Sequence, residues 1–332
     1  MKHDILLFAI ITSLLFLACE KSSAPEDKKG TPGAGVTMGA PIRMVPPGKK
    51  KQVLASSNNA TSPAIPSELD ELVALLGQPT AIPVRSLNDS IKAYGNKAIP
   101  SLLKLLADAN HHARLAAVKL LGEMKDYAQE VAPHLIALLE KEPMMQIRSM
   151  TIDALTRLDL FSEEVQAAFT KALSDAGWLV RWEAVRGLGS FGERARSFAP
   201  RLEKMLEDAN NWVQLYAAVS LLKILGTSEK AAKHLPILAL DTDARFRMNV
   251  VAQIETLPPA TCPVTAAALL KLLADPDAKV RRVAARALAT CSPELARVPA
   301  VEEPLKLAEQ DPDHSVRAHV ATALGALKPA PQ

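Results

Sequence analysis

The chain has 332 residues, of which 48% are hydrophobic and only 4% aromatic, and its formal charge at neutral pH is +3. The charge is uneven, because residues 20–66 carry seven basic and three acidic residues whereas residues 67–332 carry 31 basic and 32 acidic ones. The near-neutral body lacks the clustered cations of a nucleic-acid groove, so we expect no nucleic-acid partner. Its wealth of Ala, Leu and Val favours closely packed helices, and we expect an all-α fold.

The first segment, residues 1–18, has the pattern of an export signal. Lys2 precedes an apolar run from Ile5 to Ala18, which is too short to span a bilayer comfortably as a permanent helix. The run ends in Leu-Phe-Leu-Ala-Cys19, which resembles the lipobox of bacterial lipoproteins. The resemblance implies a lipid on Cys19 and attachment to the membrane through that lipid.

Two neighbours of Cys19 qualify the lipobox resemblance. Phe16 stands where the motif usually has Leu, so ordinary cleavage or an uncleaved anchor remains an alternative. Glu20 is not the Asp that in some bacteria retains lipoproteins in the inner membrane, and this favours the outer membrane.

Residues 19–66 are rich in Lys, Ser, Pro, Gly, Thr and Asn and show no apolar period. Such a segment cannot bury enough surface to offset its chain entropy. We therefore expect a disordered tether between the export signal and the rest of the chain.

Residues 67–328 repeat a unit of two helices. Asp275 to Cys291 shows its second half, a turn rich in Asp followed by an apolar stripe of helical period. The Arg at the head of this helix recurs at spacings of 29 to 36 residues, with Gln214 in its place once. A period of this length predicts a solenoid, here of about eight helical hairpins.

The unit resembles a known repeat family. Asp311-Pro-Asp-His-Ser-Val-Arg-Ala-His-Val-Ala-Thr-Ala-Leu-Gly325 is similar to the HEAT repeat of the phycobilisome-lyase-like type. The resemblance implies an armadillo-like superhelix whose second helices line a concave face, and a role in protein binding.

The repeated acids and arginines invite a catalytic or anion-binding interpretation, but a residue needed once per repeat is better explained as framework. Asp caps a helix and Arg bridges neighbouring turns. We expect such a structural role for the following ladder residues: Arg114, Arg148, Arg181, Arg247, Arg281 and Arg317.

The sequence offers no catalytic constellation. The seven histidines lack the spacing of three or four residues, with a carboxylate between, that a helical metal site requires. Deoxyhypusine hydroxylase, an enzyme of related architecture, holds its irons with His-Glu dipeptides, and this chain contains none. We expect no metal, no cofactor and no enzyme activity.

Two further features set particular repeats apart. Cys262 and Cys291 bracket the seventh hairpin, whose ends lie together, and in an exported protein they predict a disulfide; buried free thiols are the alternative. Aromatic residues gather in the fourth and fifth hairpins, where they form either a ligand patch or core packing. The candidate patch consists of Trp178, Trp182, Arg186, Trp212 and Tyr216.

The sequence thus favours a non-catalytic scaffold of the bacterial cell envelope that binds an envelope protein or peptide on its concave face. Two alternatives remain: an enzyme or lyase accessory with a ligand site in the concave groove, and a purely structural envelope component. Neither the partner nor the oligomeric state follows from the sequence.

Overall fold

The computed structural model describes residues 68–80 and 82–327. Contacts divide the chain into two units, Met1–Asn59 and Ala60–Gln332, and the described residues all belong to the second. The expected signal segment, Cys19 and the expected tether lie outside the described residues.

The described part is built from α-helices and short 3₁₀ turns, and it contains no strand. Eight hairpins follow one another, which confirms the all-α solenoid predicted from the repeat. Their helices are α2 Leu69–Ala74 with α3 Val84–Lys92, α4 Ile99–Leu105 with α5 His111–Leu121, α6 Ala128–Lys141 with α7 Met145–Leu158, α8 Glu163–Ala172 with α9 Trp178–Ser190, α10 Ala199–Met205 with α11 Asn211–Leu225, α12 Glu229–Leu238 with α13 Ala244–Ile254, α14 Cys262–Leu273 with α15 Ala278–Thr290, and α17 Glu302–Ala308 with α18 His314–Leu327.

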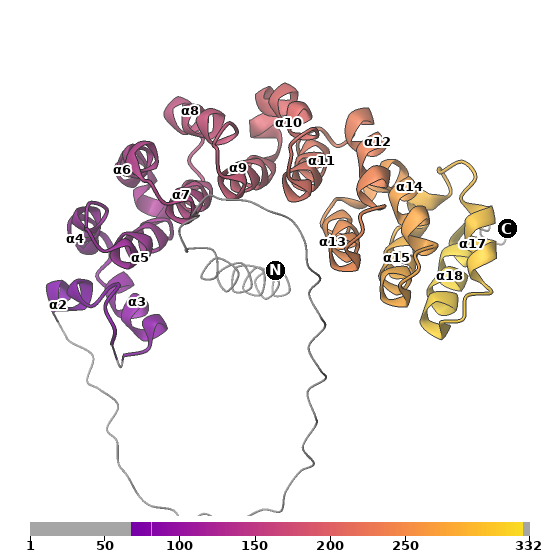
Figure 1. Cartoon of the computed structure of the whole chain (residues 1–332), viewed down its shortest axis with the longest axis horizontal. Helices are drawn as coiled ribbons and strands as arrows, with labels where there is room; N and C mark the ends of the chain where they lie inside the picture. The colour runs from indigo at the N-terminus through magenta and orange to yellow at the C-terminus, as the bar shows by residue number, and fades with distance from the viewer. Residues whose placement is uncertain (1–67, 81, 328–332) are drawn as a thin grey trace, which may run out of the picture. The chain divides into compact units, whose positions relative to one another are not determined.

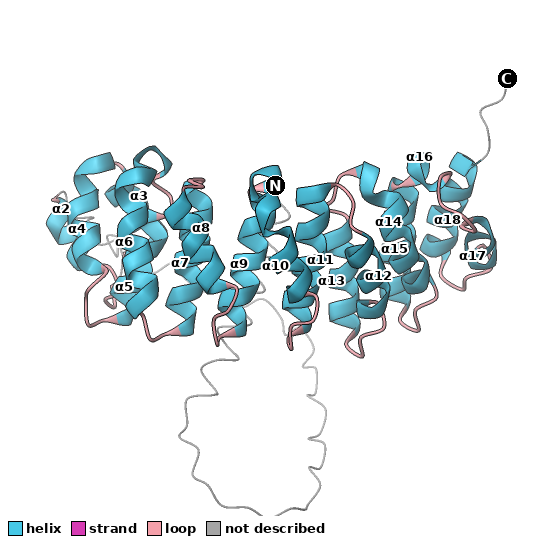
Figure 2. Ribbon diagram, turned by 90° about the horizontal axis from the view of Figure 1, so that it is seen from above, coloured by secondary structure: helices cyan, strands magenta, loops and turns pink. Residues whose placement is uncertain are grey.

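The helices of this unit form two layers along an arc. The first helix of each hairpin lies on the outer side and the second helix on the inner side, as expected for HEAT-like hairpins (Figure 1). The turns that join the two helices of each hairpin follow one edge of the array (Figure 2). The inner layer therefore lines the concave side of the repeat unit.

Small residues allow the inner helices to approach closely at the centre of the array. A Cβ added to Gly189 of α9 would lie 2.3 Å from the Ser220 hydroxyl oxygen of α11. That hydroxyl donates a hydrogen bond of 2.9 Å to the Val185 carbonyl oxygen and so joins the two helices. A larger side chain at position 189 would force them apart.

Polar side chains start most of the inner helices. Asn110, Asn210, Asp243 and Asp277 each accept a hydrogen bond from the backbone N–H two residues later. This satisfies one of the donors that every helix start leaves free. These polar turns therefore help to fix where several of the inner helices begin.

An additional short helix follows the seventh hairpin, which the repeat pattern did not predict. It is α16, Ser292–Leu295, and the chain then passes through Ala300 with a left-handed φ of 58°. The insertion explains why the spacing from Arg281 to Arg317 is the longest in the chain.

Cys262 begins α14 and Cys291 directly follows α15, and their sulfurs are bonded to each other. The two Cα atoms lie 5.9 Å apart, within the range that a disulfide spans. The bond closes the seventh hairpin at the edge opposite its turn.

We predict that the double substitution Cys262→Ala and Cys291→Ala lowers the free energy of unfolding by about 3–4 kcal/mol, because the unfolded chain regains the entropy of an open loop of about 30 residues. Urea unfolding measures the loss, and reduced wild-type protein is the control. Two thiols besides Cys19 that react with an alkylating reagent in the unfolded, unreduced chain would contradict the bond.

Candidate functional site

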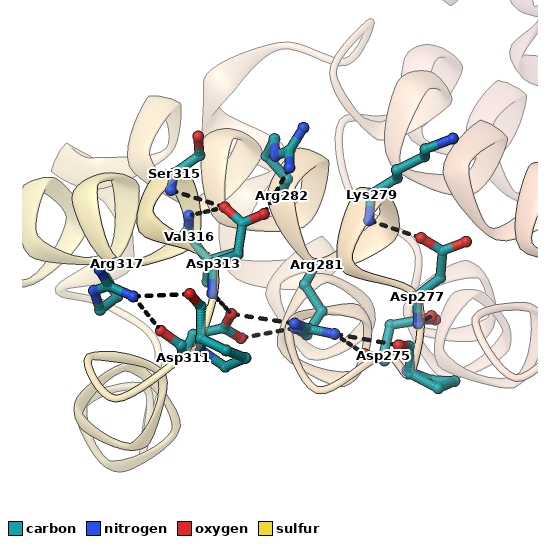
Figure 3. Close-up of polar contacts among 12 residues, drawn as sticks. Asp275, Asp277, Lys279, Arg281, Arg282, Asp311, Asp313, Ser315, Val316 and Arg317 are labelled. Carbon is teal, nitrogen blue, oxygen red and sulfur yellow. Dashed lines mark hydrogen bonds and ion pairs between the residues drawn. The ribbon is translucent and has the colours of Figure 1, made fainter.

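Five ladder arginines each connect one repeat to the next. Arg281 donates from Nε and Nη2 to the two carboxylate oxygens of Asp311, at 2.7 and 3.2 Å, and from Nη1 to the carbonyl oxygens of Asp275 and Pro276 (Figure 3). The same guanidinium thus binds the turn of its own hairpin and the acid of the following one. This geometry explains why Arg rather than Lys recurs, since only Arg has a planar fork of donors.

Four more steps have the same arrangement, with Nε-to-carboxylate distances of 2.6 to 2.8 Å. They are Arg114 with Glu142, Arg148 with Asp175, Arg181 with Asp208, and Arg247 with Asp275. The structure therefore places these side chains between repeats rather than together in one site.

Each ladder acid also shapes its own turn. Asp208 accepts a hydrogen bond of 2.9 Å from the backbone N–H of Asn210, which in turn caps α11. Although burial alone would raise it, the pKa of Asp208 is held below its ordinary value because Arg181 and this N–H bind the carboxylate. The pKa values of Glu142, Asp175 and Asp311 are lowered for the same reasons.

The ladder acid of the third hairpin is a glutamate, which a search for aspartates misses. Glu142 accepts hydrogen bonds from Nε and Nη2 of Arg114 and from the backbone N–H of Met144. It stands six residues before Arg148, the same offset that separates Asp175 from Arg181. That offset was the signal that could have found it.

We predict that Arg247→Ala lowers the free energy of unfolding by about 3–5 kcal/mol, because it leaves the Asp275 carboxylate, only 6% exposed, without its cation. Arg317→Ala is the matched control, since within the described residues Arg317 donates only to the turn carbonyls of Asp311 and Pro312. We expect a loss of about 1–2 kcal/mol there. Equal losses in urea unfolding would contradict the bridging role.

The aromatic residues of the candidate patch do not form an exposed surface. Trp182 and Tyr216 are 6% and 8% exposed and pack edge to face, with ring centroids 5.1 Å apart. An exposed patch centred on these two rings is therefore incorrect, because neighbouring inner helices cover both. Trp178 is half-buried, and Trp212 contacts Phe246 rather than the other members.

Arg186 belongs to a chain of ion pairs between inner helices, which we call the inner ion-pair chain. Arg186 donates to Asp153 at 2.7 Å and to Glu183 from Nε at 3.0 Å. Asp153 also forms an ion pair with Arg157 at 2.9 Å, and Arg157 lies 3.5 Å from the carboxylate of Glu123. Sequence reasoning missed these acids because they do not recur once per repeat.

Glu183 is the most deeply buried acid of the inner ion-pair chain. It is 2% exposed, and burial raises its pKa to about 7 in spite of Arg186, while Asp153 nearby adds to the rise. Burial also raises the pKa of the Tyr216 hydroxyl, to about 12. The centre of the concave side thus holds a carboxyl that changes charge near neutral pH.

We predict that stability declines as pH rises from about 5 to about 8, because the folded protein retains a proton on Glu183 that the unfolded chain has released. Glu183→Gln should abolish this decline in urea midpoints, whereas the exposed Glu140→Gln should not. Below about pH 4 the sign reverses, since the ladder acids lose stabilising charge on protonation. An unchanged decline in Glu183→Gln would overturn the assignment.

Two kinds of site are absent from the described residues. No group of three or more His, Cys, Asp or Glu side chains there is arranged to hold a metal ion. No helix in residues 68–80 or 82–327 combines the length and hydropathy needed to cross a membrane.

The fold and its ladder define an α-solenoid built from helical hairpins. The family model for HEAT repeats matches residues 69–156, 132–223, 166–255 and 266–332, so the chain belongs to the HEAT-repeat family. No curated protein matches the chain.

A solved structure shares this fold. The Escherichia coli protein YibA superposes with a TM-score of 0.58 at 16% identity, over 78% of this chain and 91% of that one. The phycocyanin lyase complex of CpcE and CpcF from Nostoc gives a TM-score of 0.40 at 20% identity, over 69% and 94%. Human deoxyhypusine hydroxylase gives 0.31 at 19%, over 78% and 96%. At 16% identity the likeness to YibA concerns the fold alone.

Proposed function

We propose that the chain is a non-catalytic scaffold of the bacterial cell envelope that binds a protein or peptide on the inner side of its HEAT-repeat solenoid. The observation that carries the proposal is the continuous inner layer from α3 to α18 (Figure 1). It offers one long surface whose side chains change from repeat to repeat while the ladder keeps the repeats in register.

The inner layer differs along its length in a way that suits a specific partner. The inner ion-pair chain links the inner helices of the first half through half-buried or buried groups such as Asp153 and Arg186. In the second half, Arg282 and Arg286 on α15 have side chains 50% and 54% exposed, although each has an acidic neighbour. Exposed charges of this kind set the choice of partner more than the affinity.

We predict that the double substitution Arg282→Glu and Arg286→Glu abolishes capture of the partner by chemical crosslinking in intact cells. Lys271→Glu is the control, because Lys271 is also cationic and exposed but lies on the outer helix α14 of the same hairpin. A fragment consisting of residues 1–66 alone measures background. The proposed binding face would be contradicted if the Arg282→Glu, Arg286→Glu variant still captured the partner. It would also be contradicted if the fragment of residues 1–66 captured the partner as well as the full chain does.

The envelope location rests on the lipobox-like sequence before Cys19. We propose lipidation at this residue, export, and retention in the outer membrane, with residues 19–66 as a tether. A tether of this length has a root-mean-square span of about 35–40 Å as a flexible coil. It would let the solenoid search for its partner near the surface that anchors it.

We predict that a bacterial host expressing the chain incorporates a palmitate analogue and that Cys19→Ala removes the label and releases the protein from membranes. Fractionation of the two membranes tests the outer location. An unlabelled wild-type chain that is nonetheless processed would instead indicate ordinary signal cleavage.

A further inference from the structure

Between the fifth and sixth hairpins the arginine position of the ladder holds a glutamine, so this step has no guanidinium. Gln214 occupies the arginine position and donates from Nε2 to the Asp208 carbonyl oxygen at 2.5 Å. Its Oε1 lies 3.0 Å from His234 Nε2. The shorter side chain thus keeps the contact to its own turn but does not replace the contact to the acid of the next repeat, Asp241.

Asp241 retains its role in the turn without acquiring a cation. Its Oδ1 accepts the backbone N–H of Asp243 at 2.8 Å, as the ladder acids of the neighbouring repeats do in their own turns. Its Oδ2 accepts only the neutral side-chain amide of Asn211 at 2.6 Å. Within the described residues no ion pair reaches Asp241, because the nearby Arg245 pairs with Asp243 and is itself largely exposed.

The space beside Asp241 is open and partly aromatic. A cavity of about 310 Å³ lies there, and we call it the Asp241 notch, lined by Asn211, Trp212, Asp241, Asp243 and Phe246 among others. The rings of Trp212 and Phe246 meet edge to face with centroids 5.1 Å apart. Trp212 is only half-buried, so the notch combines a carboxylate with an accessible indole.

We propose that the Asp241 notch binds an arginine side chain of a partner polypeptide. This inference rests on the proposed function and specifies the chemistry of the partner. The carboxylate would accept the paired N–H groups of the guanidinium while the indole stacks against its plane. Lysine fits less well because its ammonium is a point charge without a planar face.

The other steps of the ladder are internal evidence for this occupant. At the equivalent acids on either side, Asp208 and Asp275, a guanidinium lies 2.6 to 2.9 Å from the carboxylate oxygens. The same turn geometry at Asp241 presents the same pair of oxygens, with Gln214 too short to occupy the place. An external arginine would therefore complete a contact that the chain makes for itself elsewhere.

The test uses the full chain and a short peptide, acetyl-Gly-Arg-Gly-amide, with acetyl-Gly-Lys-Gly-amide as the matched probe. We expect the indole N–H resonance of Trp212, assigned from Trp212→Leu, to shift saturably with the arginine peptide and to require about tenfold more of the lysine peptide. Leu is tolerated at this position, since Leu179 occupies it in the preceding repeat.

Two variants separate binding from folding. Gln214→Arg should place a guanidinium of the chain itself on the Asp241 carboxylate. It should therefore both abolish the peptide-induced shift and raise the urea midpoint. Asp241→Asn should weaken peptide binding about tenfold or more, with the circular dichroism spectrum unchanged. Absence of a saturable shift in wild type, an equal response to lysine, or undiminished binding in Gln214→Arg would overturn the inference.

Failure of the proposed arginine site can be distinguished from failure of the proposed scaffold function. If both Gln214→Arg and Asp241→Asn still capture the partner and the arginine peptide does not bind, the proposed arginine site is rejected and the proposed scaffold function is retained. If the arginine peptide binds but no partner is captured, the proposed scaffold function is rejected and the proposed arginine site is retained.

Discussion

The bridge from an arginine of one hairpin to an acid of the next is the contact on which the rest of the solenoid depends. One guanidinium donates to two carbonyl oxygens in the turn of its own hairpin and to a carboxylate of the following hairpin. Arg247 does so with the carbonyls of Asp241 and Thr242 and with the carboxylate of Asp275. The acid in turn accepts a hydrogen bond from the backbone N–H of the residue that caps the next inner helix, as Asp275 does from Asp277. Register, turn shape and helix start are therefore set by the same small group of atoms.

Along most of the array, the framework contacts and the side chains that vary between repeats lie in different places. The ladder lies along the turn edge, whereas the inner layer is free to vary, and the centre of that layer departs most from the repeat. There Trp182 and Tyr216 fill the space between inner helices, and Glu183 is buried beside Arg186. Buried polar groups of this kind demand satisfied partners, so they restrict how neighbouring repeats pack.

Repetition makes exceptions easy to recognise. Five steps share one arrangement, and at Gln214 the chain leaves the Asp241 carboxylate without that arginine partner. The disulfide from Cys262 to Cys291 is a second exception, confined to the seventh hairpin, and α16 beyond it is a third. Each distinguishes one repeat from its neighbours, which a binding surface on an otherwise regular array requires.

The sequence by itself determined the helical hairpins, their number and the role of the arginines as framework, because these depend on short-range periodicity and on chemistry repeated about every 33 residues. It did not determine which aromatic rings are exposed, since burial of Trp182 depends on Tyr216 of the next repeat. It also did not predict Glu183 with its pKa near 7 or the Asp241 notch. Both arise where side chains of successive hairpins, distant in the chain, meet each other, and only the tertiary structure decides which of them touch.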